Sequence, residues 1–304
     1  MNKGIFYIII SGLSFLVVNF FVKLFGSGPN NPVLPNLQKI PAHELVLARS
    51  IISLVISFVI IFRNNLPLFG VNKRWLIIRG AFGTLALTIF FLSIQNLPFS
   101  ISATIQYLAP IFTMIFAAFL LNEKILKIQW ILVSMAFVGV AVVSLNGYIL
   151  KDETLNIDFF WIGMGLLSAS CSGVAYIAIV KLKSTDHPVS VVSFFPLIAA
   201  PAMIVWCCFD FVMPRGIEWL ILLLIGIFTQ IAQISLTRAL HLDHASKIIP
   251  FQYLGSIYAL LVGFLILDER LNAVIISGVA LILIGVTLNS ILRSYYDKKY
   301  VKHI

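Results

Sequence analysis

Residues 100–124 read SISATIQYLAPIFTMIFAAFLLNEK, and residues 246–270 read SKIIPFQYLGSIYALLVGFLILDER. The two stretches align without a gap at an interval of 146 residues. Apolar matches carry little information, but the polar ones do: Gln-Tyr-Leu recurs, and 16 residues after each glutamine comes Asn-Glu-Lys or Asp-Glu-Arg. The sequence therefore contains an internal repeat.

The repeat lies in a chain that is too apolar for an ordinary soluble domain. Of its 304 residues, 60% are hydrophobic and 11% charged, whereas soluble domains carry roughly 25% charged residues. Apolar runs of about 20 residues, enough for a helix to cross the bilayer core, follow one another almost without pause. We predict an all-α integral membrane protein with ten transmembrane helices, at residues 4–24, 43–62, 74–95, 98–121, 127–146, 158–181, 188–210, 217–239, 245–267 and 271–292.

The repeat divides these ten spans into two halves, residues 1–150 and 151–304. The first and sixth spans also end alike, with Val22-Lys23-Leu24 and Val180-Lys181-Leu182. Each half then has five helices, and because five is odd, the second half is inverted relative to the first. Inverted repeats are a structural basis of alternating access, with the substrate near the midplane between the halves.

The distribution of positive charge predicts the orientation of the chain. With the N-terminus in the cytoplasm, most lysines and arginines fall on the cytoplasmic side, which is the bias that sets membrane topology. Both termini are therefore expected in the cytoplasm, and the first span is expected to be a retained helix, with a cleaved signal peptide as the alternative. The net charge of +9 does not indicate nucleic-acid binding. The exceptions to the bias are Lys39, Lys151, Arg215 and Arg270 on the outer side, and Lys23 and Arg49 within spans.

Short motifs in both halves form one recognisable pattern. The motifs are Phe21-Val22-Lys23-Leu24, Glu44 with Arg49, Ser100 through Pro110, Asn122-Glu123-Lys124 and Asp268-Glu269-Arg270, with Pro110 replaced by Ser256 in the second copy. Together with the repeat, these motifs resemble the EamA type of the drug/metabolite transporter superfamily. The resemblance implies a basket in which helices 1–4 and 6–9 surround a central cavity and helices 5 and 10 are peripheral. It leaves the substrate open among amino acids, drugs, nucleotide sugars and other metabolites.

Polar residues within the spans are the candidates for a binding site. Glutamine offers a donor and an acceptor, and tyrosine offers an aromatic face with a hydroxyl, which suits an amphipathic small molecule. The alternative is that these side chains only join neighbouring helices. The first-rank candidates are the repeated pairs Gln106-Tyr107 and Gln252-Tyr253, and the second-rank ones are Tyr176, Gln230 and Gln233.

Charged residues within the spans need a partner, a water-filled cavity or a route to the interface. Arg49 is expected either to bind an anionic group of the substrate or to pair with Glu44 or with backbone carbonyls. Lys247 is a further candidate for substrate binding, and Glu44 is the one candidate for proton coupling. Snorkelling toward an interface is expected instead for Arg79, Lys181, Arg238 and Lys23.

These features predict a secondary transporter that exports a small amino-acid-like or otherwise amphipathic metabolite across the inner (plasma) membrane by alternating access. One alternative is an organic-anion or nucleotide-sugar carrier or exchanger, with Arg49 and Lys247 as its anion sites. Another is a non-transporting membrane sensor or assembly subunit.

An enzyme is not expected, because the five histidines lie in loops or at helix ends and the sequence has no nucleotide-binding P-loop. We expect no cofactor and no metal. The expected partners are the small-molecule substrate and the lipid bilayer, without nucleic acid, and the protein is expected to be a monomer or a homodimer.

Overall fold

The computed structural model describes residues 3–30, 32–121, 126–145, 158–242, 251, 254–269 and 272–300. Throughout these residues the regular secondary structure is helical. Eight of the helical segments are long and apolar enough to cross a membrane, and Lys127–Val143 is a shorter apolar helix. The prediction of an all-α membrane protein is confirmed. The number of ten spans stays a prediction, since the ninth, 245–267, is only partly described.

Most helices begin and end within a few residues of the predicted spans. The largest extension is at the last helix, which continues beyond residue 292 to Tyr300. In chain order the helices are α1 (Lys3–Ser27), the 3-10 turn η1 (Gly28–Asn30), α2 (Ala42–Arg63), α3 (Lys73–Asn96), α4 (Phe99–Gln106), α5 (Ala109–Leu121), α6 (Lys127–Ser144), α8 (Phe159–Leu182), α9 (Pro188–Cys207), α10 (Ile217–Leu242), α12 (Leu254–Leu265) and α13 (Ala273–Tyr300).

The predicted fourth span, 98–121, is not one continuous helix. It breaks at Tyr107 and Leu108 into α4 and α5. The amide of Tyr107 donates to Thr104 O at 3.1 Å and that of Leu108 to Ile105 O at 3.0 Å, so the helix tightens to three-residue spacing here. Pro110 accounts for the break, because it has no N–H to donate and its ring crowds the preceding turn. Broken helices within a membrane occur where the backbone lines a cavity or is buried in protein.

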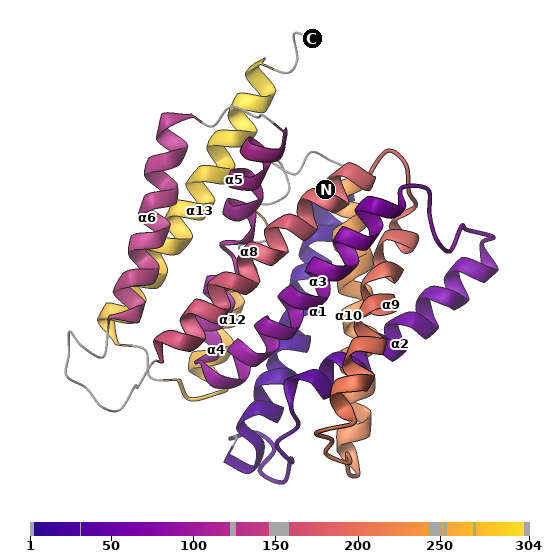
Figure 1. Cartoon of the computed structure of the whole chain (residues 1–304). Helices are drawn as coiled ribbons and strands as arrows, with labels where there is room; N and C mark the ends of the chain where they lie inside the picture. The colour runs from indigo at the N-terminus through magenta and orange to yellow at the C-terminus, as the bar shows by residue number, and fades with distance from the viewer. Residues whose placement is uncertain are drawn as a thin grey trace.

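Helices far apart in the sequence pack against one another in pairs. α1 packs against α10, α3 against α8, α2 against α9, and α6 against α13. Figure 1 shows α6 and α13 side by side at one edge of the molecule. This contact requires glycine, because a Cβ on Gly139 would lie 2.5 Å from the carbonyl oxygen of Gly278. The resemblance implied peripheral fifth and tenth helices, and α6 and α13 lie in that position.

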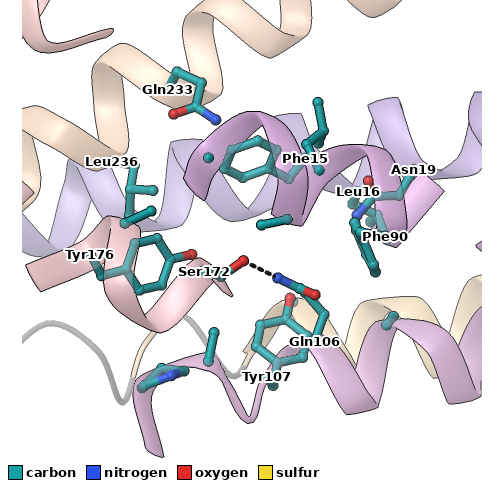
Figure 2. Close-up of a pocket in the computed structure, with 18 of the residues that line it drawn as sticks. Phe15, Leu16, Asn19, Phe90, Gln106, Tyr107, Ser172, Tyr176, Gln233 and Leu236 are labelled. Carbon is teal, nitrogen blue, oxygen red and sulfur yellow. Dashed lines mark hydrogen bonds between the residues drawn. The ribbon is translucent and has the colours of Figure 1, made fainter. Parts of the chain in front are cut away.

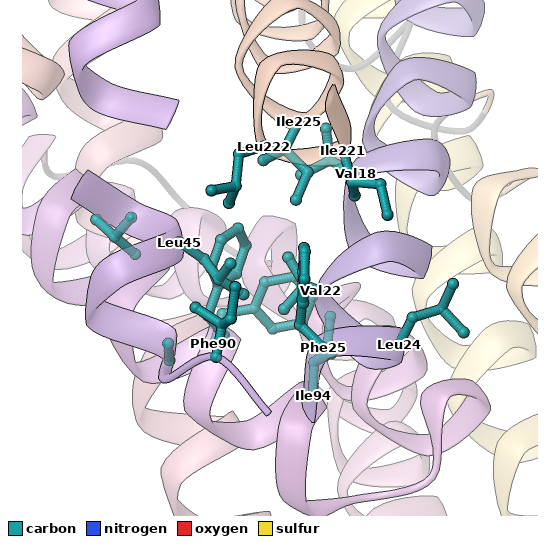
Figure 3. Packing of buried hydrophobic residues seen from close by; sticks show 14 of the residues in the cluster. Val18, Val22, Leu24, Phe25, Leu45, Phe90, Ile94, Ile221, Leu222 and Ile225 are labelled. Atoms are coloured by element: carbon teal, nitrogen blue, oxygen red, sulfur yellow. The ribbon is translucent and has the colours of Figure 1, made fainter. Parts of the chain in front are cut away.

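One end of the bundle is closed by buried apolar side chains, which we term the first apolar cluster (Figure 3). They come from the second half of α1, the segment before α2, the start of α2, the end of α3, α9 and the start of α10. Side chains that are packed and buried in this way fill the space between these segments. The cluster includes Val18, Val22, Phe25, Leu45, Phe90, Ile94, Ile221, Leu222 and Ile225.

A second apolar cluster closes the opposite end. Its residues come from the start of α1, the start of α3, the end of α8, the start of α9 and the end of α10. Because α1, α3 and α10 contribute their other ends to the first cluster, the two clusters lie at opposite ends of the bundle. The second apolar cluster consists of Ile8, Leu76, Ile179, Leu182, Val191, Phe194, Leu236, Ala239 and Leu240.

Candidate functional site

A cavity of about 120 Å³ lies between the two apolar clusters. Along α1, for example, Phe15 and Asn19 line it, between Ile8 of the second cluster and Val22 of the first. Its walls come from α1, α3, α4, α5, α8, α9, α10 and α12. Figure 2 shows Gln106, Tyr107, Ser172, Tyr176 and Gln233 around this space, together with Phe15, Leu16 and Phe90. The cavity therefore combines aromatic walls with a few polar groups, the usual character of a small-molecule site.

Gln106 is the last residue of α4, and its position is fixed at both ends of that short helix. At the start of α4, the Glu269 carboxylate accepts hydrogen bonds from the backbone N–H of Phe99 and, at 3.1 Å, of Ser100. A carboxylate at a helix N-terminus accepts hydrogen bonds from the free N–H groups there and interacts favourably with the helix dipole. At the other end, Pro110 stops the helix. Gln106 is thereby held at the level of the cavity.

The amide of Gln106 is oriented by two serines of α8. Its Nε2 donates to Ser172 Oγ at 2.8 Å (Figure 2), and its Oε1 lies 3.0 Å from Ser168 Oγ. The Ser168 hydroxyl also lies 2.7 Å from the Ala86 carbonyl oxygen. Gln106 lines the cavity, and this network gives the amide a defined direction for a further hydrogen bond to a bound molecule.

Tyr107 follows in the break between α4 and α5 and also lines the cavity. Its hydroxyl lies against α12, where a Cβ on Gly255 would be 2.0 Å from the Tyr107 Oη. Only glycine leaves room for the phenol in this arrangement. Gly255 thus places the Tyr107 ring beside the cavity.

Arg79 is the charged residue of α3 that lines the cavity. The sequence predicted that its side chain snorkels to the interface, and this is wrong: the residue is 4% exposed, and its Nη2 donates to Gln233 Oε1 at 2.9 Å. Its Nε has no hydrogen-bond partner among the described residues. Lys181 and Arg238, given the same interpretation, are exposed. Lys23 is half-buried, and its Nζ donates to Leu97 O at 2.5 Å.

Gln233 and Tyr176 line the same part of the cavity as Arg79. Gln233 comes from α10 and Tyr176 from α8, and the close-up shows both side chains among the residues that line the cavity (Figure 2). The Tyr176 side chain is near enough to interact electrostatically with the Arg79 guanidinium. Two of the second-rank candidates therefore join the first-rank pair Gln106-Tyr107 around one cavity.

Arg49 lies outside the cavity lining. It is fully buried, and its three guanidinium nitrogens have no hydrogen-bond partner in the described part of the chain. The guanidinium sits 5.4 Å from the Phe91 ring centroid and 5.3 Å from that of Phe195. The pairing with Glu44, one of the alternatives considered for this residue, is not formed: Glu44 Oε2 accepts from the Val212 N–H at 3.0 Å. The charge is held by aromatic faces.

Gln230 and Glu44 also lie outside the lining residues. Gln230 is 2% exposed, donates through Nε2 to Ser57 Oγ at 2.8 Å and accepts from Ser53 Oγ. It joins α10 to α2, which is the alternative role considered for polar residues. Glu44 lies at the start of α2, and its part in proton coupling stays a prediction. Three further candidates, Lys247, Gln252 and Tyr253, lie outside the described residues.

Sequence reasoning missed several lining residues. Arg79 shares a face of α3 with three other lining residues, Gly83, Ala86 and Phe90, at helical spacings of four, three and four. That periodicity could have indicated that Arg79 points inward rather than to the interface. Ser172, Asn19 and the aromatic walls Phe15, Phe99 and Phe195 carried no distinctive signal.

The chain matches known membrane transporters over nearly its whole length. The profile of the EamA-like transporter family matches residues 2–145 and again residues 159–291. The chain is 26% identical to the pseudopaline exporter CntI of Pseudomonas aeruginosa (strain UCBPP-PA14), over 94% of this chain and 95% of that protein. It is 22% identical to the S-adenosylmethionine uptake transporter of Rickettsia felis, over 92% of each.

Two further similarities carry less information: one covers about half of the sequence, and the other is a similarity of structure. The riboflavin transporter of Vibrio cholerae is 27% identical over 52% of this chain and 51% of its own length. A solved crystal structure superimposes with a TM-score of 0.62 at 19% identity, covering 97% of this chain and 98% of that one. At that identity the likeness establishes the fold, and it says nothing of the solute.

Proposed function

The chain belongs to the EamA-like transporter family and is a multi-pass protein of the inner membrane, and from this premise we propose that it exports a small amphipathic metabolite by alternating access. The observation that carries the proposal is the cavity between two apolar clusters, with Gln106, Tyr107, Tyr176 and Gln233 on its walls. A solute bound there is separated from both ends of the bundle by packed side chains. Opening one cluster at a time would carry it across.

We propose that the fold consists of ten helices in two inverted halves, residues 1–150 and 151–304. The two family matches, 2–145 and 159–291, support this division. The helix pairs support it too: exchanging the first half for the second turns the α1–α10 pair into the α8–α3 pair, and leaves α2–α9 and α6–α13 unchanged. The same exchange turns four segments of the first apolar cluster, the ends of α1 and α3 and the starts of α2 and α10, into the ends of α8 and α10 and the starts of α9 and α3, which belong to the second. Figure 1 places the start of α1 and the end of α13 at the same end of the bundle, and the charge bias puts that end in the cytoplasm.

Each end of the bundle also carries a contact that joins the two halves through a carboxylate. At the start of α2, Glu44 Oε2 accepts from the Val212 N–H at 3.0 Å, in the loop between α9 and α10. Just before α9, Asp186 accepts from the N–H groups of Val71 at 2.5 Å and Asn72 at 3.3 Å, in the loop between α2 and α3. We term these the Glu44 clasp and the Asp186 clasp.

The two clasps lie at opposite ends of α2. This helix has 22 residues, so its ends are about 33 Å apart at 1.5 Å per residue. Each clasp uses a carboxylate near the start of the second helix of one half and backbone N–H groups of the equivalent loop in the other half. They are suited to act as paired latches, one for each side of the membrane.

The cavity volume of about 120 Å³ favours a compact solute. Pockets for drug-sized ligands typically measure roughly 300–1,000 Å³. A nucleotide sugar would therefore need a wider conformation, and we favour the smaller metabolites among the alternatives.

The experiment combines a thermal-shift screen of the purified protein with transport by the same protein in liposomes. A metabolite that raises the melting temperature should raise it less in Gln106→Ala. The rise should be unchanged in the control Arg238→Gln, since the Arg238 side chain is exposed. The same compound should exchange across the membrane of proteoliposomes and not of empty liposomes. A stabilising ligand that depends on Gln106 and never crosses would refute the transport proposal.

A further inference from the structure

We infer that the transported solute is an organic anion with an apolar, preferably aromatic, body, and that Arg79 binds its anionic group inside the cavity. The inference rests on the proposed function and specifies its substrate class. It moves the expected anion site from Arg49 and Lys247 to a residue that the sequence assigned to the interface.

The state of the Arg79 guanidinium is the first observation. The residue is 96% buried, and its Nη2 donates to Gln233 Oε1 at 2.9 Å. Its Nε–H is buried and has no acceptor among the residues that the structure describes. Among the described lining residues there is no aspartate or glutamate to balance the charge. A buried cation that keeps an unused donor and lacks a counter-ion is completed by an anionic ligand.

A second positive charge lies behind the cavity wall. Phe195 lines the cavity, and its ring is 5.3 Å from the Arg49 guanidinium on the far side. Arg49 and Arg79 repel each other electrostatically, and neither forms an ion pair within the described part of the chain. In a low-dielectric interior the two charges add, so the potential in this part of the cavity is positive. An anion there relieves the repulsion.

The other lining residues indicate the chemical character of the uncharged part of the solute. Aromatic rings from five different segments face the cavity, among them Phe15, Phe90, Phe99, Tyr107 and Tyr176. Gln106 is one of the few polar groups of the lining, and it is already held by Ser168 and Ser172. One charged side chain in a mainly aromatic and apolar wall matches a monovalent anion with a compact ring better than a polyanion or a sugar.

The charge of the solute has a consequence for direction. Arg79 stays with the protein, so the net charge carried in one crossing is that of the anion. A membrane potential that is negative inside drives an anion outward. Export would then be electrogenic and supported by the potential, without a carboxylate in the cavity to carry a proton.

The test uses three probes that share one skeleton: phenylacetate, 2-phenylethanol and 2-phenylethylamine. The full chain in detergent is melted with each probe, as wild type, Arg79→Gln, Arg79→Lys and the control Arg238→Gln. Phenylacetate should raise the melting temperature of the wild type and the control by several degrees more than the alcohol or the amine does. Arg79→Gln should abolish this difference, and Arg79→Lys should retain part of it.

A second readout separates ligand binding from a structural role. If Arg79 serves the ligand, Arg79→Gln without probe should melt at or above the wild-type temperature, because it removes a buried charge that lacks a counter-ion. Equal stabilisation by the amine, no stabilisation by phenylacetate, or an unchanged phenylacetate effect in both Arg79 variants would overturn the inference.

Transport distinguishes this inference from the function on which it rests. Proteoliposomes that exchange 2-phenylethylamine but not phenylacetate would leave the carrier proposal standing and remove the anion site. Phenylacetate binding that needs Arg79, in a protein that transports none of the probes, would leave the anion site standing and remove the carrier proposal.

Discussion

Weakening one clasp should open one end of the protein, and Asp186→Asn is the sharpest way to do it. The Asp186 side chain is 8% exposed, and its carboxylate accepts from the N–H groups of Val71 and Asn72 and from the Thr185 hydroxyl. Asparagine keeps one acceptor oxygen and loses the charge and the second acceptor. The clasp is therefore weakened without creating a cavity.

The magnitude follows from these contacts. Hydrogen bonds to a charged group contribute about 1.5–3 kcal/mol each, and those between neutral groups about 0.5–1.5 kcal/mol. Replacing two of the first kind by one of the second costs the closed end about 1.5–5.5 kcal/mol, with a central value of about 3.5 kcal/mol. Since about 1.4 kcal/mol is a tenfold change in an equilibrium constant, the central value makes opening at this end roughly 300-fold more favourable.

The assay follows a cysteine at Ser172, which lines the cavity, after Cys171, Cys207 and Cys208 have been changed to serine. A membrane-impermeant maleimide is added to one side of oriented vesicles. Asp186→Asn should speed labelling from the end at which Asp186 lies and slow it from the other, and Glu44→Gln should do the opposite. As long as most molecules are closed at that end, the labelling rate should rise by up to the same factor as the equilibrium constant for opening.

Asp158→Asn is the matched control. Its carboxylate also accepts from a backbone N–H, that of Phe160 at 2.8 Å, but within its own helix α8. This variant should leave labelling from both sides unchanged. If Asp186→Asn and Glu44→Gln shift access toward the same side, or if neither shifts it, the reasoning about two opposed latches is refuted.

Three further predictions concern the cavity, the buried charge and one helix cap. Gly255→Ala should lower the melting temperature, because its Cβ would lie 2.0 Å from the Tyr107 Oη and overpacking costs about 1–3 kcal/mol. Adding Tyr107→Phe should restore much of the loss. If the stability losses of the two single variants simply add in the double variant, the clash is not the cause. Arg49→Met should raise the melting temperature of the unliganded protein, because the three guanidinium nitrogens are buried without a hydrogen-bond partner among the described residues, and apolar replacement of buried charged groups is often stabilising, by about 1–4 kcal/mol. A large drop would mean that Arg49 has a partner outside the described residues. Partial burial and the nearby Arg238 guanidinium lower the pKa of His187, whose Nδ1 accepts from the Val189 N–H at the start of α9. The contribution of His187 to stability is therefore present above about pH 6.5 and declines as the pH falls toward the lowered pKa. Melting curves between pH 8 and 5 should show this decline, and His187→Asn should flatten it.

The helices were predictable because hydropathy acts locally. The predicted spans 43–62 and 217–239 lie inside Ala42–Arg63 and Ile217–Leu242. The break at Tyr107–Leu108 was not predicted, although Pro110 was known, because apolar composition continues across it. Composition reports whether a segment suits a bilayer, and it does not report how the backbone inside it is bonded.

The two buried arginines show why the site was harder. Hydropathy gives the depth of Arg49 and Arg79 in their spans, but not the direction of either side chain. The contacts that decide the direction come from distant segments: Phe91 and Phe195 for Arg49, and Gln233 for Arg79. Sequence reasoning therefore assigned Arg79 to the interface, and left Arg49 open between substrate binding and a structural pairing.

The clasps could not be read from the sequence for a different reason. Glu44 and Asp186 bind backbone N–H groups of Val212, Val71 and Asn72. Side-chain patterns carry no record of such partners, since every residue other than proline offers an N–H. Only the fold brings these loops and carboxylates together.

Locking the two ends in turn tests alternating access most directly. In the cysteine-free protein, Val71→Cys with Asp186→Cys, or Glu44→Cys with Val212→Cys, is joined by a short bifunctional maleimide in proteoliposomes that exchange an identified solute. Either cross-link alone should stop exchange, while the same pairs without the reagent keep it. Exchange that continues with one end fully cross-linked would contradict a carrier in which each end must open in turn.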